Sequence, residues 1–328
     1  MGLRQQATGT TAMTARALKI VVGDRNVLPH KAEFEKALPV GAEVVWVVPF
    51  DESRVIPELA DADVYVGGKF SAAMGESAPR LKMIHVAGAG TDNVDRSGLS
   101  PDVEVCTTFH HERSIAEYIV SATVMLRRNF LAQDRALRTG VFRTSVYDPS
   151  IPQPLSLVGA RIGFVGFGHI GRQAWRLFDA YGARGAAVTG SGTAADVGLE
   201  WFGSTAELEK LMEWSDVVVV SAPLTDSTRG MIGADELSGL GRSGVLVNVG
   251  RGPLVQEQAL FDALSWNVIA AAAIDVWYRY PGPDGVGQPS TLPFADLDNI
   301  LMTPHSSGVT HHTFVGRVAD IAANISRL

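Results

Sequence analysis

Polar side chains follow three apolar runs of the sequence, at points where strands of a parallel sheet are expected to end. They are Arg251, which stands between two glycines, Asp275, and His305, which follows a proline. Because the carboxyl ends of parallel strands meet at one edge of a sheet, we expect these side chains to share a cleft. A guanidinium offers a planar fork that suits a carboxylate, and an imidazole exchanges protons near neutral pH. The pattern indicates chemistry on a small acid.

Two of these residues also have a purely structural interpretation. Arg251 opens a helical segment, where it would pair with a neighbouring acid instead of a substrate. An aspartate that closes an apolar strand is costly to bury unless it is hydrogen-bonded. Asp275 therefore either caps a turn or holds a ligand amide.

A glycine-rich loop lies earlier in the chain. Gly166, Gly168 and Gly171 follow an apolar run and open a helical pattern. In that context glycines let the backbone turn sharply and approach a pyrophosphate at a helix N-terminus. The alternative is a tight turn that holds no ligand. We favour a bound dinucleotide because the strand, helix and next strand are all present.

The strand after the glycine loop ends at Thr189, where a dinucleotide-binding domain usually carries an acid that binds the adenosine ribose. Without that carboxylate a 2′-phosphate is not repelled, yet no Arg or Lys in 189–193 attracts it. The sequence leaves both NAD and NADP open. The hydroxyls of Thr189, Ser191 and Thr193 are candidate cofactor contacts, and an ordinary polar turn is the alternative.

Two series of apolar strands alternating with helical segments would position these residues. Strands this uniformly apolar, separated by helices, predict parallel sheets covered on both faces. We therefore expect an α/β protein with two doubly wound domains, in which a Rossmann-type cofactor domain is inserted in a smaller, flavodoxin-like substrate domain. The predicted boundaries are a disordered N-terminus at 1–16, a substrate domain at 17–122 and 306–328, and a cofactor domain at 123–305.

Helix signals and loops divide the two series. An apolar-periodic segment runs from about Ser114 to Arg138, and Ser114 and Glu117 have the spacing of a capping box. We expect one long helix there, and another capping box at Ser204 and Glu207. The segment 280–293 is dense in Pro and Gly, and such a long loop is often functional.

Composition excludes several classes of protein. The 28 basic and 35 acidic residues give a net charge of −7 without long like-charge blocks, so neither nucleic acid nor a membrane surface is an expected partner. The single cysteine, Cys106, cannot form an intramolecular disulfide, which fits the cytoplasm. His311 and His312 lack a carboxylate or thiol that would complete a ligand set with His305, so we assign no metal site.

Seven motifs in order along the chain resemble those of the D-isomer-specific 2-hydroxyacid dehydrogenases. This family includes glycerate, phosphoglycerate and formate dehydrogenases. The resemblance runs from about Val64 to the C-terminus. The motifs are Gly88-Ala89-Gly90-Thr91-Asp92, Ile115-Ala116-Glu117, the glycine loop, Ala222-Pro223-Leu224-Thr225, Arg251-Gly252, Asp275-Val276 and Thr303-Pro304-His305.

The resemblance implies a role for each matching residue. Arg251 would hold the substrate carboxylate and polarise its carbonyl, while His305 would exchange the proton. The resemblance also implies a homodimer formed through the cofactor domain. The implied substrate contacts are the amides of Ala89 and Gly90; the implied cofactor contacts are Asp275 and Ser307 at the nicotinamide carboxamide, His169 and Ile170 at the pyrophosphate, and Pro223 and Thr228 on the adenosine side.

The main departure from the family pattern is Tyr280, which stands where hydroxyacid enzymes carry an acid that supports the charged histidine. A phenol is neutral near pH 7, so it can orient His305 without stabilising its charge. We therefore include Tyr280 in the catalytic set with Arg251 and His305. Formate dehydrogenases carry a neutral Gln at this place, and Ser307-Gly308 also resembles that branch. Against it, His111 replaces their Asn and the long N-terminal extension is missing.

These observations favour an NAD(P)-dependent oxidoreductase that interconverts a small 2-hydroxy acid and a 2-keto acid. His111, just before the long helix, is a candidate substrate contact, although a solvated polar loop is the alternative. Two other functions stay open: formate-dehydrogenase-like oxidation without proton transfer, and a cofactor-binding sensor whose chemistry has decayed.

Overall fold

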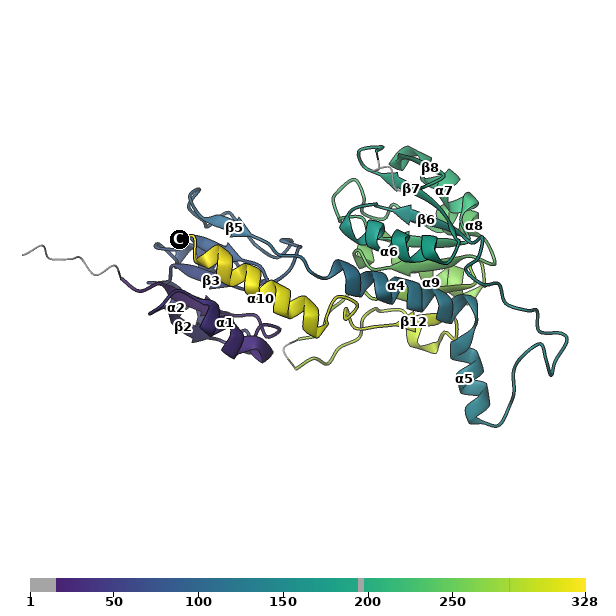
Figure 1. Cartoon of the computed structure of the whole chain (residues 1–328), viewed down its shortest axis with the longest axis horizontal. Helices are drawn as coiled ribbons and strands as arrows, with labels where there is room; N and C mark the ends of the chain where they lie inside the picture. Colours follow the sequence, from purple (N-terminus) through teal and green to yellow (C-terminus); the bar gives the residue numbers. More distant parts are fainter. Residues whose placement is uncertain (1–15, 194–197, 283) are drawn as a thin grey trace, which may run out of the picture. The chain divides into compact units, whose positions relative to one another are not determined.

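The computed structural model describes residues 16–193, 198–282 and 284–328 (Figure 1). The chain forms two compact units, one built from the residues up to Phe109 together with Phe314–Leu328, and the other from His110–Thr313. The segment 1–16, for which we predicted disorder, lies outside the described residues except for Arg16. Two α/β units in a discontinuous arrangement were expected from the sequence, and the fold class is confirmed.

The first unit is built on a five-stranded sheet whose strands all pair in parallel in the order β2-β1-β3-β4-β5. Because β1 lies between β2 and β3, the chain reverses its direction of winding at β1, which is the flavodoxin-like order. The strands are short and apolar, as buried parallel strands are. They are β1 Lys19–Val22, β2 Glu43–Trp46, β3 Val64–Val66, β4 Met83–His85 and β5 Glu104–Cys106.

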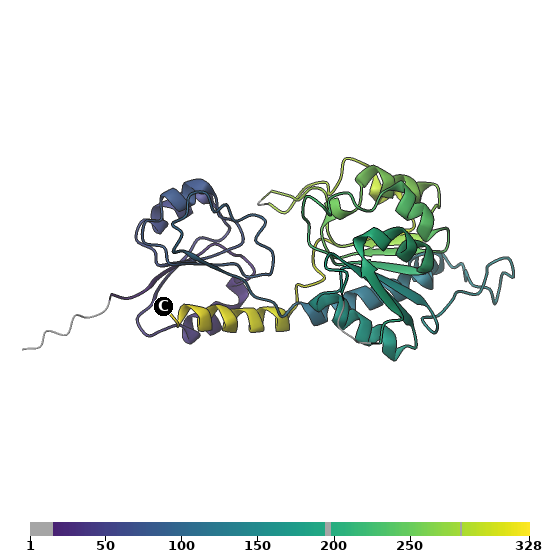
Figure 2. The same cartoon turned by 90° about the horizontal axis from the view of Figure 1, so that it is seen from above.

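Helices cover both faces of this sheet. On one face, α10 (His311–Ile325) and α1 (Lys31–Ala37) pack against alternate strand residues such as Ile20 and Val22. The C-terminal helix α10 therefore returns to the first sheet, as both views show (Figures 1 and 2). On the other face, α2 (Glu52–Leu59) and α3 (Ala72–Glu76) cover the remaining strand residues. A short 3₁₀ turn, η1, precedes α1 at Leu28–His30.

The second unit holds a seven-stranded, all-parallel sheet in the order β12-β11-β10-β9-β6-β7-β8. The winding reverses between β6 and β9, which is the Rossmann arrangement with its ligand crevice at the carboxyl ends of those strands. The strands are β6 Arg161–Val165, β7 Arg184–Thr189, β8 Trp201–Ser204, β9 Val217–Val220, β10 Val245–Asn248, β11 Ala271–Ile274 and β12 Ile300–Met302.

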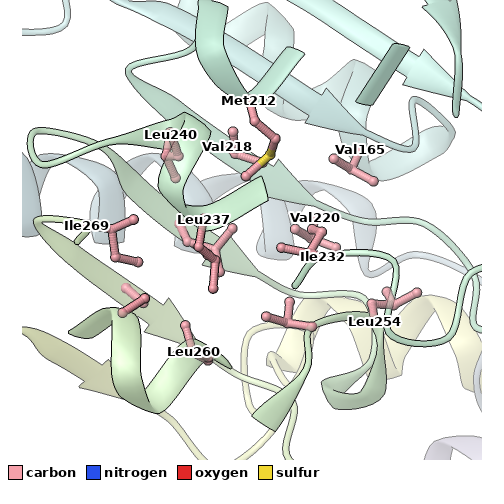
Figure 3. Close-up of a cluster of buried hydrophobic side chains, with 14 of the residues drawn as sticks. Val165, Met212, Val218, Val220, Ile232, Leu237, Leu240, Leu254, Leu260 and Ile269 are labelled. Carbon is pink, nitrogen blue, oxygen red and sulfur yellow. The ribbon is translucent and has the colours of Figure 1, made fainter. Parts of the chain in front are cut away.

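Two buried clusters line the faces of this second sheet. One face packs against α4 (Glu112–Arg127) and α6 (His169–Ala180). The opposite face, drawn in Figure 3, packs against three helices through side chains such as Met212, Leu237 and Leu260. Those helices are α7 Leu208–Trp214, α8 Ala234–Leu240 and α9 Glu257–Ser265, and the 3₁₀ turns η2 Thr205–Glu207, η3 Gly252–Leu254 and η4 Phe294–Asp296 complete the unit.

The long helix predicted over 114–138 is wrong in two respects. It consists of two helices, α4 and α5 (Phe130–Arg138), separated at Asn129, whose φ of 53° lies in the left-handed region. The predicted capping box at Ser114 does not form, because α4 already begins at Glu112. Ser114 Oγ instead contacts the hydroxyls of Thr310 and Thr313, each at 3.0 Å. The second predicted capping box, at Ser204, is present.

The second unit begins at residue 110 and ends at residue 313. The cofactor domain predicted from the sequence was shorter and spanned 123–305. All of α4 belongs to the second unit because its buried face packs against α6 and the second sheet. Within the apolar run before Asp275, Asn267 has a φ of 52°, in the left-handed region, and β11 begins only at Ala271. In the part of the chain that the structure describes, none of the helices combines the length and the hydropathy needed to cross a membrane.

Candidate active site

The glycine loop connects β6 to α6 beside the reversal point of the second sheet. Gly166 has a φ of 85°, and a Cβ there would lie 2.7 Å from the backbone N and Cα of Ala222. Any side chain would therefore collide with the neighbouring loop. Ser221 Oγ donates to the carbonyl oxygen of Gly166 at 2.9 Å and holds the two loops together.

The N-terminus of α6 has the features that a bound pyrophosphate requires. Gly168 is the N-cap of this 12-residue helix, and as a glycine it offers no side chain that could cap the first amides. A Cβ on Gly168 would meet nothing within 4 Å, so the side of the loop next to those amides is open. His169 and Ile170 begin the helix. Exposed amides at the positive end of a helix dipole suit an anionic phosphate, and the loop therefore fits a dinucleotide.

Arg251 is held between two neighbouring loops by the glycines on either side of it. A Cβ on Gly250 would lie 2.9 Å from the carbonyl oxygen of Ala222, and one on Gly252 would lie 2.5 Å from that of Trp277. These close approaches explain why both positions are glycine. Arg251 itself is half-buried in an extended conformation, and its Nη1 donates to the Gly250 carbonyl at 2.8 Å. The guanidinium thus lies beyond the end of β10.

Asp275 fixes the loop that carries His305. Its side chain is fully buried and accepts hydrogen bonds from Thr303 Oγ1 at 2.7 Å and from the amide of Ser306 at 2.9 Å. The amide of Ser307 donates at 3.1 Å, and the Ser307 hydroxyl also donates. Four donors saturate a carboxylate, which has about four acceptor sites. Of the two interpretations of Asp275, the turn-holding one is what the structure displays.

Two aromatic residues extend this network. Thr303 Oγ1 and Tyr118 Oη lie 2.9 Å apart. Because the single proton of Thr303 goes to Asp275, Tyr118 is the donor. Trp277 Nε1 donates to the carbonyl oxygen of Thr303 at 2.8 Å. Burial raises the pKa of Tyr118 to about 12, so its proton stays in place for donation.

His305 lies in the left-handed region with a φ of 56°, an uncommon conformation that the surrounding bonds must maintain. Its Nδ1 lies 3.1 Å from Tyr280 Oη, and the two rings are tilted at 47°. The same phenol oxygen accepts a hydrogen bond from the Trp277 amide at 3.2 Å. The tyrosine that departs from the family pattern therefore contacts the histidine directly.

The electrostatic surroundings of this pair favour the uncharged forms of both side chains. Removal of water by packed protein atoms lowers the pKa of His305; Asp275 opposes this effect and Arg251 adds to it. Burial likewise raises the pKa of Tyr280, against the effects of the Trp277 amide and Arg251. Both shifts disfavour the charged state, as desolvation does in general. Near neutral pH the pair therefore consists of a phenol and a neutral imidazole.

His111 is brought to the same loop by α4, of which it is the N-cap. It is buried, and a Cβ built on Gly308 would lie 3.2 Å from the His111 Cβ. The interpretation of this segment as a solvated loop is therefore wrong for His111, because its side chain packs beside the residues that follow His305.

The residues that are candidates for contact with the adenosine of the cofactor form hydrogen bonds within their own loops. Thr189 Oγ1 donates to the carbonyl oxygen of Thr193 at 2.9 Å, and the hydroxyls of Ser191 and Thr193 are 2.9 Å apart. The turn is polar and uncharged. In the loop after β9, Thr228 Oγ1 donates to the Pro223 carbonyl at 2.8 Å.

Ala89 and Gly90 belong to the first unit, in the loop that follows β4. Ala89 is exposed, and the base of the loop is closed by the Thr108 amide, which donates to the Gly88 carbonyl at 3.1 Å. The loop lies at the carboxyl edge of the first sheet, where ligands of doubly wound domains bind.

Sequence reasoning missed Tyr118, Thr303 and Trp277 as parts of the site. Thr303 stood inside a recognised motif, but no signal in the sequence tied it to Asp275. Tyr118 lies within a helix, where its spacing alone resembles that of a core residue. Only the fold brings α4 against the loop after β12.

This chain is similar to known proteins in both sequence and structure. A family model described as D-isomer specific 2-hydroxyacid dehydrogenase, NAD binding domain, matches residues 120–307. Glycerate dehydrogenase from Methylorubrum extorquens is 32% identical over 230 residues, covering 69% of this chain and 69% of that protein.

Two solved structures extend the likeness over nearly the whole chain. One is the NADPH-dependent glyoxylate/hydroxypyruvate reductase of Sinorhizobium meliloti in complex with NADP and malonate, with a TM-score of 0.73, 27% identity, and coverage of 94% of this chain and 92% of that one. The other is the NAD-dependent formate dehydrogenase of Staphylococcus aureus in complex with NAD, with a TM-score of 0.75, 25% identity, and coverage of 94% and 95%. The chain belongs to the D-isomer specific 2-hydroxyacid dehydrogenase family.

Proposed function

We propose that this protein interconverts a small 2-hydroxy acid and the corresponding 2-keto acid with NAD or NADP. One observation carries the proposal: Arg251, Asp275 and His305 follow β10, β11 and β12, which are adjacent in one parallel sheet. A carboxylate-binding fork, a buried anchor and a proton-exchanging imidazole thus lie at the ends of neighbouring strands. This combination suits an acid whose carbonyl or hydroxyl carbon reacts.

In this reaction the bound nicotinamide supplies or accepts the hydride. Arg251 binds the substrate carboxylate and polarises the adjacent carbonyl, because its fork can engage two oxygens at once. His305 exchanges a proton with the substrate oxygen, and Tyr280 orients its imidazole. The further substrate contacts that we propose are the amides of Ala89 and Gly90 and the imidazole of His111.

The glycine loop would hold the pyrophosphate through Gly166, Gly168, Gly171 and the first amides of α6, at His169 and Ile170. Ser307 donates its own proton to Asp275, so its oxygen keeps lone pairs that can accept from the nicotinamide carboxamide. In this arrangement Asp275 acts on the carboxamide through Ser307. On the adenosine side we propose Thr189, Ser191, Pro223 and Thr228, and their uncharged surroundings admit either cofactor.

Steady-state kinetics on a panel of 2-keto acids, run with NADH and NADPH, test the proposed function. Arg251→Ala should abolish reduction of every keto acid while the dissociation constant of the reduced cofactor, measured by fluorescence, stays within about twofold. Arg176→Ala, which removes an exposed arginine on α6, is the matched control and should keep full activity. Normal turnover by the Arg251 variant would refute the proposed function.

Formate oxidation is the second candidate, because Tyr280 is uncharged and the formate dehydrogenase structure has a similar fold. Oxidation of formate releases carbon dioxide and leaves no proton for His305 to exchange. If formate is the substrate, His305→Gln should lose far less activity than Arg251→Ala, and the pH profile should be flat. Failure of every acid with either cofactor would instead favour a cofactor-binding sensor.

We further propose a homodimer formed through the cofactor domain. The helix α5 buries none of its residues, and the segment after it exposes large apolar side chains, including Phe142 at 59%, Val146 at 79% and Tyr147 at 69%. Figure 1 shows α5 and this segment extending away from the second sheet. An apolar surface of this kind is typical of a protein interface. Sedimentation should give twice the chain mass, and Phe142→Glu with Tyr147→Glu should give the monomer.

The cytoplasm is the location that we propose. The lone thiol of Cys106 is buried, and burial raises its pKa to about 11, so it persists as an unreactive thiol. Fractionation of the source cells with antibody detection would test this location.

A further inference from the structure

The hydroxyl of Tyr280 is fixed from two sides within the second unit. The Trp277 amide donates to its oxygen at 3.2 Å, and His305 Nδ1 lies 3.1 Å away on the other side. An amide can only donate, so the phenol oxygen is an acceptor toward Trp277. Its own proton is not used in that bond and is available to His305.

The chemistry of the two rings decides which of them donates in the Tyr280–His305 bond. A phenol releases its proton near pH 10 and is a stronger donor than the N–H of a neutral imidazole. An imidazole nitrogen binds a proton near pH 6.5 and is a stronger acceptor than a phenol oxygen. The phenol therefore donates to Nδ1, and the proton of the neutral imidazole belongs on Nε2.

The charged groups near Tyr280 and His305 do not change the direction of the hydrogen bond between them. Asp275, after β11, already accepts from four donors and has no site left for the phenol proton. Arg251, after β10, can only donate. These are the two charged groups that act on both His305 and Tyr280, and His305 responds to them in opposite directions.

We propose that neutral His305 donates its Nε2 proton to the substrate oxygen during reduction while Tyr280 passes its proton to Nδ1. This inference rests on the proposed function and assigns the source of the proton. Tyr280 is then a positioning and relay residue that acts on the substrate through His305. A neutral histidine held as a donor by its surroundings is an established catalytic device.

Two coupled proton transfers bring the proton to the substrate oxygen. When the carbonyl carbon has received the hydride, the Nε2–H bond breaks and the O–H bond of the hydroxy acid forms. The phenol O–H bond breaks as the Nδ1–H bond forms, so the negative charge moves from the substrate oxygen to Tyr280. After the product leaves, solvent protonates Nε2, and Nδ1 returns its proton to the phenolate. The Trp277 amide, which donates to the phenol oxygen, and Arg251 both lower the pKa of Tyr280 and stabilise this transient charge.

A carboxylate at position 280 would act in the opposite way. It can only accept, so it would keep the proton on Nδ1 and stabilise the charged imidazole. An enzyme of that kind loses its reductase activity as the pH rises above the histidine pKa. With the relay, activity should persist until Tyr280 itself loses its proton.

Nitrogen-15 NMR of the whole protein, with labelled histidine, reads the tautomer of His305 directly and needs no substrate. His305→Gln assigns the signal. At a pH of about 8, where an ordinary histidine is neutral, we expect His305 to carry its proton on Nε2. Tyr280→Glu should move the proton to Nδ1 and raise the midpoint of titration. A wild-type protein with the proton on Nδ1 would overturn the inference.

Three tyrosine variants link the tautomer to the reaction. Tyr280→Phe should remove the preference for Nε2 and lower kcat for reduction by about 100-fold, with little change in KM. In Tyr280→Glu, kcat/KM should fall about tenfold for each pH unit above the histidine pKa, whereas the wild-type profile stays level. Tyr278→Phe is the matched control, because the Tyr278 hydroxyl donates to the Val255 carbonyl at 3.0 Å and does not contact His305. It should keep the wild-type tautomer and pH profile.

The two kinds of failure are distinguishable. A protein without activity toward any acid would refute the proposed function, while the NMR result would still decide where the proton lies. Conversely, an active reductase with an Nδ1 tautomer, or a Tyr280→Phe variant with an unchanged tautomer, would refute the relay alone.

Discussion

Ser307 donates both its amide and its hydroxyl to the buried carboxylate of Asp275. With Thr303 and Ser306 also bound to that carboxylate, the turn from β12 to His305 is fastened to the end of β11. The unusual backbone conformation of His305 is thereby maintained. The position of the imidazole thus depends on a neighbouring strand as much as on its own.

Asp275→Asn should destabilise the second unit by about 3 kcal/mol. The amide nitrogen of the asparagine would face hydrogen-bond donors of the turn, and these donors would be left without an acceptor. Urea denaturation followed by tryptophan fluorescence measures this loss. Asp298→Asn is the control, since the Asp298 side chain is 93% exposed in its ion pair with Arg135 and such pairs contribute at most about 1 kcal/mol. Equal stabilities for the two variants would mean that Asp275 does not anchor the turn.

Gly166→Ala and Gly168→Ala should separate folding from cofactor binding. At Gly166 a Cβ meets backbone atoms and the φ is positive, so alanine should cost about 2 kcal/mol or more. At Gly168 a Cβ meets nothing within 4 Å, so alanine should leave the stability unchanged. Because this open space lies next to the amides that would bind the pyrophosphate, the dissociation constant of the reduced cofactor should rise at least about tenfold. Thermal melting and fluorescence titration measure the two effects. Unchanged cofactor binding by Gly168→Ala would argue against a pyrophosphate at this loop.

Thr189→Asp should shift cofactor preference toward NADH. The turn at Thr189 is uncharged, and a carboxylate there would accept from the ribose hydroxyls of NAD and repel a 2′-phosphate. The ratio of kcat/KM for NADH to that for NADPH should rise at least about tenfold. Thr189→Ser keeps the hydroxyl and should leave the ratio unchanged. A ratio that does not respond to the aspartate would place the adenosine ribose elsewhere.

The first unit should lose stability as the pH falls through the range in which an ordinary histidine gains its proton, near pH 6.5. His85 is fully buried: its Nδ1 lies 3.1 Å from the Val86 carbonyl, and its Nε2 accepts from Asn324 Nδ2 of α10 at 2.8 Å. Burial lowers the pKa of His85. The unfolded chain therefore binds this proton more readily, and the stabilisation is present above the unfolded pKa and lost below it.

Denaturant titrations at pH 7 and pH 5 should show this loss, and His85→Gln should reduce the difference between the two pH values. Glutamine does not titrate, so the variant removes the linkage while keeping a polar side chain. An equal pH dependence in both proteins would assign the effect to other groups.

Much of the fold was predictable because its signals are local. Uniformly apolar runs such as Val217–Val220 indicate buried parallel strands whatever surrounds them. The glycine loop and the capping box at Ser204 are equally local, and both are present. The predicted capping box at Ser114 failed because α4 already begins at Glu112, and the Ser114 hydroxyl contacts Thr310 and Thr313, almost 200 positions away.

The sequence by itself determined which residue types are available for chemistry, since a guanidinium, an imidazole and a phenol have fixed donor and acceptor properties. Only the tertiary structure decided how they are used. The proton of Tyr280 is directed by the Trp277 amide and received by His305, a residue from another strand end. Hydrogen bonds require atoms within about 3 Å of each other, and only the folded arrangement of the strands brings these residues that close.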